Sequence, residues 1–141
     1  MTGDEPPRRL HHVTFAVSPE RLDEATQLFT ELGFTLNPGE LPDAGLHIRL
    51  DWDRGIELIS PIAGSTAGPA ASVNEFLKNH GDGVYTVVLH LPDASAAESV
   101  AERYNSHTRY RFDISGNGTY CSEIELSVLG LPLTFMATNI P

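Results

Sequence analysis

The chain has few basic residues, and this shortage excludes whole classes of partner. It holds one lysine in total, and 9 Lys and Arg residues stand against 19 Asp and Glu residues, for a formal net charge of −10. A nucleic-acid-binding domain needs a basic surface, so we expect no nucleic-acid partner. The charge also disfavours a polyanionic ligand, although four arginines could form a small basic site locally: Arg49, Arg54, Arg109 and Arg111.

The chain also lacks a cysteine pair, a long apolar run and an apolar leader. Cys121 is the only cysteine, so no internal disulfide can form, and a reducing compartment is expected. No apolar run approaches the ~20 residues that a membrane-spanning helix needs, and residues 1–9 contain no apolar leader segment. With 40% hydrophobic residues the chain can bury a core. We therefore expect a globular, cytoplasmic protein with no membrane partner.

The first half of the chain predicts one helix among several strands. Apolar residues alternate at strand spacing in three stretches. In a fourth stretch they recur at helical spacing, and Ser18-Pro19 before it and Gly33 after it are typical of the start and the end of a helix. We expect strands over 12–17, 46–52 and 56–60, a helix over 19–32, and a loop over 37–45.

The second half repeats this order, which indicates an internal duplication. The stretches "VTFAVSPERLDEATQLF" and "VVLHLPDASAAESVAERY" stand in equivalent places. Between the halves, Ser72 and Glu75 have the spacing of a capping box and predict a short helix. We expect strands over 84–91, 109–114, 120–128 and 133–137, and a helix that begins at Pro92. The predicted organisation is a flexible arm (1–9), a first module (10–64), a linker with a short helix (65–82) and a second module (83–138), together one domain.

Four stretches resemble the vicinal oxygen chelate superfamily, which includes glyoxalase I, bleomycin-resistance proteins, methylmalonyl-CoA epimerase, and extradiol and hydroxyphenylpyruvate dioxygenases. They are "LHHVTFAV", "FTELGF", "GIELISP" and "EFLKNHGDGVYTVVLHLPD". The last is particularly similar to hydroxyphenylpyruvate dioxygenases and methylmalonyl-CoA epimerases. The resemblance implies an α+β fold in which two tandem βαβββ modules form a cupped, barrel-like mixed sheet with helices on the outside. It also implies a homodimer.

In this superfamily four positions hold a divalent metal ion in the cup, and this chain matches two of them. His12 and Glu57 fall on the two positions of the first module and suit Fe, Mn, Ni or Zn. The two positions of the second module fall on Thr86 and Thr134, where His and Glu are typical. Because hydroxyls are poor ligands for these metals, the resemblance implies an incomplete metal site.

Strand parity adds further candidates to this site. The residues expected to line the cup beside the two threonines are Thr14, Val88, His90, Glu125 and Met136. His90 and Glu125 are possible replacement ligands, and Glu57 is the candidate catalytic carboxylate. Glu123 and Glu125 lie opposite the apolar face of their strand and could point inward, but whether they and His47 face the cup stays open. His11 is expected at the surface.

Three functions fit these residues. The preferred one is binding of a small molecule in the cup, as in bleomycin-resistance proteins, and the net charge of −10 favours a cationic or neutral ligand. The first alternative is a metal-dependent enzyme of the glyoxalase, epimerase or dioxygenase type that uses replacement ligands. The second is a metal-free accessory domain that resembles the N-terminal half of hydroxyphenylpyruvate dioxygenase.

Overall fold

The computed structural model describes residues 8–141, and it divides the chain into two compact units. The first unit is His12–Tyr85, and the second joins Thr86–Pro141 to the N-terminal residues up to His11. Most of the predicted arm, residues 1–7, lies outside the described residues. Arg9, the last residue of that predicted arm, already begins a strand.

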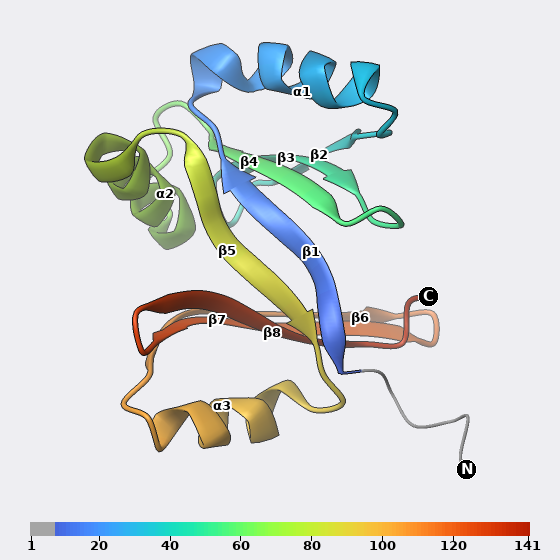
Figure 1. The fold of residues 1–141 in the computed structure, drawn as a ribbon, viewed down its shortest axis with the longest axis vertical. Coiled ribbons are helices and arrows are strands. Elements are labelled where there is room, and N and C mark those ends of the chain that lie inside the picture. The colour runs from blue at the N-terminus through green and yellow to red at the C-terminus, as the bar shows by residue number, and fades with distance from the viewer. Residues whose placement is uncertain (1–7) are drawn as a thin grey trace. The chain divides into compact units, whose positions relative to one another are not determined.

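The first unit contains a mixed sheet in the order β2-β3-β4-β1 (Figure 1). Its elements are β1 (Arg9–Ala16), a 3-10 helix (Pro19–Arg21), α1 (Leu22–Glu31), β2 (Asn37–Leu41), β3 (Leu46–Asp51), β4 (Ile56–Pro61) and α2 (Gly68–His80). β1 is parallel to β4, whereas β3 is antiparallel to both of its neighbours.

The second unit repeats this arrangement in the order β5-β8-β7-β6. Its elements are β5 (Gly83–His90), α3 (Ala94–Glu102), β6 (His107–Gly116), β7 (Thr119–Val128) and β8 (Leu131–Thr138). β5 is parallel to β8, and the other pairs are antiparallel. The predicted α+β fold with two βαβββ modules is therefore confirmed. No helix among residues 8–141 is long and apolar enough to cross a membrane.

Two elements differ from the sequence-based expectation. β2 occupies residues 37–41, where a loop was expected because Pro38 and Gly39 disfavour a strand. β2 is the edge strand of its sheet, and an edge strand tolerates a proline that a central strand would not. α2 begins at Gly68 rather than at Ser72, with a proline in its first turn, and the Ser72 hydroxyl accepts a hydrogen bond from Tyr85 (3.0 Å) instead of capping the helix.

The start of the 3-10 helix that precedes α1 is held by the linker residue Asp82 rather than by a local cap. The Ser18 side chain makes no cap hydrogen bond to the helix and donates to Asp82 instead (3.0 Å). Arg21 donates to the same carboxylate through Nε (2.9 Å) and Nη2 (3.0 Å). These donors hold the pKa of the Asp82 carboxyl below its usual range, with Arg21 the larger cause. The contact therefore stabilises the junction between β1 and α1.

Each sheet has two distinct faces, and the helices define them. In the first unit α1 packs on the face that includes Leu58, and α2 packs on the face that includes Ala16 and Ile59. In the second unit α3 packs on the face that includes Leu126 and Phe135 (Figure 1). Because the side chains of a strand alternate between the two faces of the sheet, these assignments show on which face each strand residue lies.

Candidate functional site

His12, Thr14 and Glu57 form a hydrogen-bonded cluster in the first unit. The parallel register of β1 and β4 sets Thr14 opposite Glu57, and His12 lies two residues earlier on the same face. Thr14 Oγ1 donates to Glu57 Oε1 at 2.7 Å, and His12 Nε2 lies 3.3 Å from the same oxygen. The His12 and Thr14 side chains are buried, whereas the Glu57 side chain keeps 15% exposure. The structure thus brings together the two metal-ligand candidates of the first module.

Thr86 and Thr134 form the equivalent pair in the second unit. The parallel register of β5 and β8 sets Val88 opposite Thr134, and Thr86 lies two residues before Val88. The first unit has the same offset, because Thr14 lies opposite Glu57 and His12 lies two residues before Thr14. The two threonine hydroxyl oxygens are 3.0 Å apart and buried. The duplication therefore extends to the site, with a pair of hydroxyls where the first unit has an imidazole and a carboxylate.

The remaining predicted pocket residues share the face of the second unit that α3 does not cover. Thr134 lies opposite Val88 on one side and Glu125 on the other, and Met136 lies opposite His90 and Glu123. His90 Nε2 donates to the carbonyl oxygen of Thr138 (3.3 Å). These four side chains therefore share one face of the second unit.

Other residues near these candidates lie where sequence reasoning did not place them. His11 was expected at the surface but is buried, and its ring packs edge-to-face on His90 with centroids 6.0 Å apart. Arg109 Nε lies 3.4 Å from Glu125 Oε2, a pairing that strict alternation hides because the β6–β7 register shifts between Thr108 and Tyr110. His47, whose orientation was open, lies on the sheet face opposite to Glu57, since it pairs with Ser60.

The donor set at these positions does not match the four-ligand metal site that the sequence resemblance implies. His12 and Glu57 supply one nitrogen and one carboxylate, and the equivalent positions supply only hydroxyls. Within residues 8–141, no group of three His, Cys, Asp or Glu side chains is arranged to hold a metal ion.

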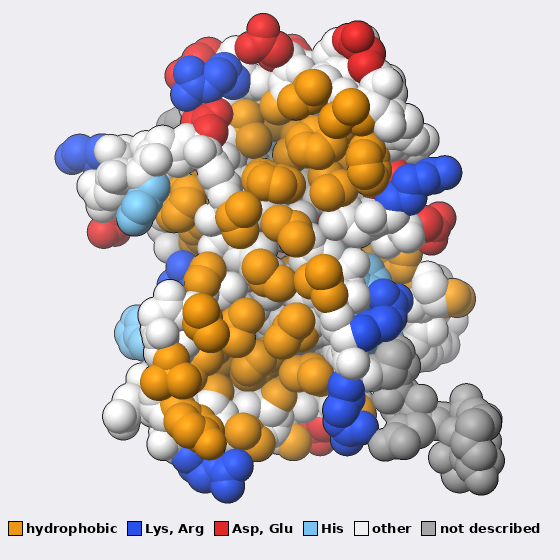
Figure 2. Space-filling model, in the orientation of Figure 1, with side chains coloured by type: hydrophobic (Ala, Val, Ile, Leu, Met, Phe, Trp, Pro, Cys, Tyr) orange, Lys and Arg blue, Asp and Glu red, His pale blue; other side chains and the backbone are white. Residues whose placement is uncertain are grey.

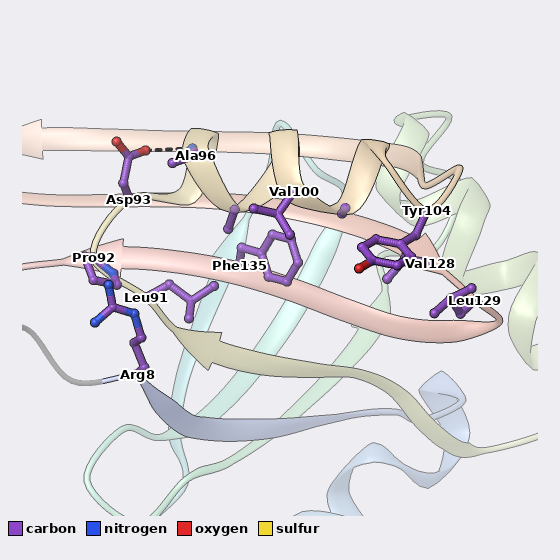
Figure 3. A pocket seen from close by; sticks show the side chains of 12 residues that line it. Arg8, Leu91, Pro92, Asp93, Ala96, Val100, Tyr104, Val128, Leu129 and Phe135 are labelled. Atoms are coloured by element: carbon purple, nitrogen blue, oxygen red, sulfur yellow. Dashed lines mark hydrogen bonds between the residues drawn. The ribbon is translucent and has the colours of Figure 1, made fainter.

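Each unit also has an apolar cavity beside its first helix. The cavity beside α3, about 480 Å³, is lined by Val100, Tyr104, Leu129 and Phe135 among others, with Arg8 and Asp93 at one end (Figure 3). The cavity beside α1, about 550 Å³, is lined by Phe15, Leu28 and Phe29 among others. Figure 2, in the orientation of Figure 1, shows apolar side chains gathered near α1 and again near α3. The α3 cavity lies on the face of its sheet opposite to Thr134, so it is distinct from the predicted site.

Cys121 lies near the start of β7 and is a buried cysteine of the second unit. Its side chain is buried, and burial together with the Glu123 carboxylate raises the pKa of the thiol to about 12. Since the thiolate is the reactive form, Cys121 is inert at neutral pH. Cys121 is therefore a small packed side chain of the second unit.

Solved structures of other proteins share this fold. Methylmalonyl-CoA epimerase from Mycobacterium tuberculosis is 20% identical, with a TM-score of 0.66 over 97% of this chain and 92% of that chain. A variant of the Streptomyces coelicolor epimerase in complex with 2-nitronate-propionyl-CoA is 16% identical, with a TM-score of 0.66 over 94% of this chain and 98% of that chain. A mutant of 4-hydroxymandelate synthase from Streptomyces coelicolor is 16% identical, with a TM-score of 0.66 over 99% of this chain and 50% of that chain.

These likenesses concern the backbone, because sequence identity is low throughout. No family model matches the chain, and no curated protein matches it. The three structures include two epimerases and a synthase, so they share an architecture but not one activity. The function therefore has to be argued from the site itself.

Proposed function

We propose that this chain, which has the fold of the vicinal oxygen chelate superfamily, binds a small organic molecule on the sheet face that carries His12, Thr14 and Glu57. The observation that supports this most directly is the state of the Glu57 carboxylate. Within the described residues both of its hydrogen bonds go to Oε1, which leaves Oε2 for a ligand. A carboxylate held in place by two buried neighbours loses little freedom when it accepts a further hydrogen bond.

The charge of the site and of the chain indicates the class of ligand. Glu57 offers a negative oxygen, and the net charge of −10 favours a neutral or cationic molecule over an anion. The variant of the Streptomyces coelicolor epimerase was solved in complex with a CoA derivative. One lysine in the whole chain of the present protein is a poor match for the phosphates of such a ligand. We therefore expect a small, partly apolar ligand with a hydrogen-bond donor or an amine directed at Glu57.

The alternative of a metal-dependent enzyme requires replacement ligands, and the contacts of the best candidate argue against it. Glu125 is opposite Thr134 in the β-ladder, but its carboxylate is paired with Arg109. The second alternative, a metal-free accessory domain, is supported by the match of this chain to half of the 4-hydroxymandelate synthase chain.

We further propose a cytoplasmic homodimer. The lone buried Cys121 supports the location, and an exposed strand edge supports the dimer.

Metal analysis tests the first part of this proposal. We expect the wild-type protein, incubated with iron, manganese, nickel or zinc and then dialysed, to retain far less than one ion per chain by plasma mass spectrometry. The His12→Ala variant should give the same content, because two ligands hold a divalent ion weakly. Near-stoichiometric metal that disappears in His12→Ala would contradict the proposal and favour the metal-dependent enzyme.

A binding screen tests the second part. Neutral and cationic aromatic metabolites, screened by thermal shift without metal, should include ligands that raise the melting temperature. For such a ligand, Glu57→Gln is expected to raise Kd about 10- to 100-fold, the usual effect of a lost charge-assisted hydrogen bond.

Glu40→Gln is the matched control, since it makes the same charge change on the opposite face of the same sheet, opposite His47, and should leave Kd unchanged. The anions 2-nitronate-propionyl-CoA and 4-hydroxymandelate serve as comparators. If they bind as well as the cationic ligands, or if Glu57→Gln has no effect, the assigned role of Glu57 is wrong.

A further inference from the structure

The turn between β7 and β8 contains a leucine that is both strained and exposed. Leu129 has φ +55°, in the left-handed region that a bulky L-residue rarely adopts. The residue is 74% exposed, so its side chain gains little from packing within the chain. Backbone strain of this kind persists only where the surrounding structure enforces it, and it is frequent at ligand-binding sites. Leu129 therefore marks a position where a binding role has to be considered.

The hairpin between β6 and β7 shows which residues this kind of turn favours. Each of the two turns has a pair of residues with positive φ, Asn117 and Gly118 in one and Leu129 and Gly130 in the other. The φ values agree closely, at 53° and 79° in the first turn and 55° and 78° in the second. Asparagine followed by glycine is the favoured sequence, because asparagine tolerates the left-handed conformation. Leu129 thus occupies a position at which the same chain elsewhere has an asparagine.

Leu129 lines the α3 cavity, and other apolar side chains of this cavity are also exposed. Val100 is 49% exposed and Tyr104 is 53% exposed, and both line the cavity beside the buried Phe135 (Figure 3). The volume of the cavity is about 480 Å³, within the range of about 300 to 1,000 Å³ that is typical of small-molecule sites. An apolar molecule bound there would remove these side chains from water.

The polar end of the cavity carries one charge of each sign, Arg8 and Asp93 (Figure 3). Asp93 Oδ1 accepts the Ala96 N–H at 3.0 Å, and within residues 8–141 Oδ2 is left for a further donor. A guanidinium has five N–H donors, so Arg8 can bind a further acceptor. Asp93 would repel a carboxylate ligand, and Arg8 would repel an ammonium ligand. A hydroxyl group suits this end of the cavity, because it can donate to Asp93 and accept from Arg8.

We propose that the α3 cavity binds an aliphatic alcohol, with the hydroxyl group at the end that carries Arg8 and Asp93. The alkyl chain lies along α3 and contacts Tyr104 and Leu129 at the other end of the cavity. α3 has nine residues and is therefore about 13 Å long, which leaves room for an extended chain of medium length. The cavity lies on the opposite sheet face from Thr134, so this site is independent of the binding proposed at Glu57.

Three probes with one chain and different head groups test the class of ligand: octan-1-ol, octanoate and octylammonium. In titrations followed by amide NMR shifts, octan-1-ol should shift the signals of Val100, Tyr104 and Leu129. The two charged probes should bind at least about fivefold more weakly, which is the effect of one like charge close by in water. Failure of octan-1-ol to shift these signals, or equal binding of all three probes, would overturn the proposal.

Asp93→Asn tests the role of the charge at the polar end. Asparagine is as good a helix cap as aspartate, so α3 should stay intact while the repulsion of an anion is lost. Octanoate should therefore gain about fivefold in affinity relative to octan-1-ol. Asp23→Asn, the same change at an exposed position of α1, is the control and should alter neither affinity. An unchanged preference in Asp93→Asn would show that Asp93 does not select the head group.

Leu129→Asn separates binding from folding. Asparagine relieves the strain of the turn, so the melting temperature should rise by about 2 to 4 °C. The Kd for octan-1-ol should rise at least about fivefold, because part of the apolar wall is lost. Leu32→Asn makes the same change at an exposed leucine of the first unit and should leave this Kd unchanged. An unchanged Kd in Leu129→Asn, or an equal loss of affinity in Leu32→Asn, would contradict the assigned site.

Discussion

Gly45→Ala is expected to lower the free energy of unfolding by about 2 to 4 kcal/mol, from backbone strain and overpacking together. Gly45 has φ +70°, a conformation that disfavours any side chain. A Cβ built there would lie 2.1 Å from Ser65 Oγ, 2.8 Å from Ser65 Cβ and 2.9 Å from Ala70 Cβ. The hydroxyl can rotate away, but the two Cβ atoms move only with the backbone. Urea unfolding of the variant and the wild-type protein measures the difference.

Gly64→Ala separates the two causes of this loss. Gly64 has φ +78°, and an added Cβ would meet nothing within 4 Å. This variant should therefore lose only about 1 to 2 kcal/mol, the cost of the left-handed conformation for an L-residue. If the two variants lose the same stability, the close approach at Gly45 is not tight and the expectation is wrong.

The Gly45 contact matters for the candidate site because it positions α2. The Ala70 N–H donates to the Ala44 carbonyl oxygen at 3.0 Å, and the Ile62 N–H donates to the Gly45 carbonyl oxygen at 2.7 Å. α2 packs against Ile59, which lies two residues after Glu57 on the same sheet face, so a displaced helix changes the surface of that face. A ligand that binds at Glu57 should accordingly bind more weakly to Gly45→Ala than to Gly64→Ala.

The sequence predicted best the strands that have one fully buried face. In β7 the apolar residues Ile124, Leu126 and Val128 are buried on the face towards α3 and the acidic residues lie on the other face, so a period of two was visible in the residues themselves. The same parity placed Glu125 on the face of Thr134. The pairing of His12 with Glu57 was predicted from the family resemblance, and the register of β1 with β4 brings the two side chains together.

The sequence could not predict features that depend on long-range pairing or on an exception to a local rule. β2 is a strand despite Pro38 and Gly39, because β3 offers a partner and the edge position needs no second one. His11 is buried by packing on His90, which is far away in the sequence. Arg109 reaches Glu125 only because the ladder shifts register beside it.

Leu58→Ala and Leu126→Ala are each expected to lower the free energy of unfolding by about 2 to 5 kcal/mol, which is the usual cost of a cavity left by a buried leucine. Both side chains are completely buried, Leu58 in the core under α1 and Leu126 in the core under α3. One variant therefore weakens the first unit and the other weakens the second. Calorimetry compares the two variants with the wild-type protein.

The number of transitions is the informative result, because it tests whether the two modules form one domain. Two strands belong partly to each unit: β1 passes from one unit to the other between His11 and His12, and β5 passes between Tyr85 and Thr86. Unfolding either unit would break both strands, so each variant should show one transition, shifted to lower temperature as a whole. A profile with two transitions, of which each variant shifts only one, would mean that the modules unfold independently. The predicted single domain would then be wrong, and a ligand bound at Glu57 would stabilise only the unit that contains Glu57.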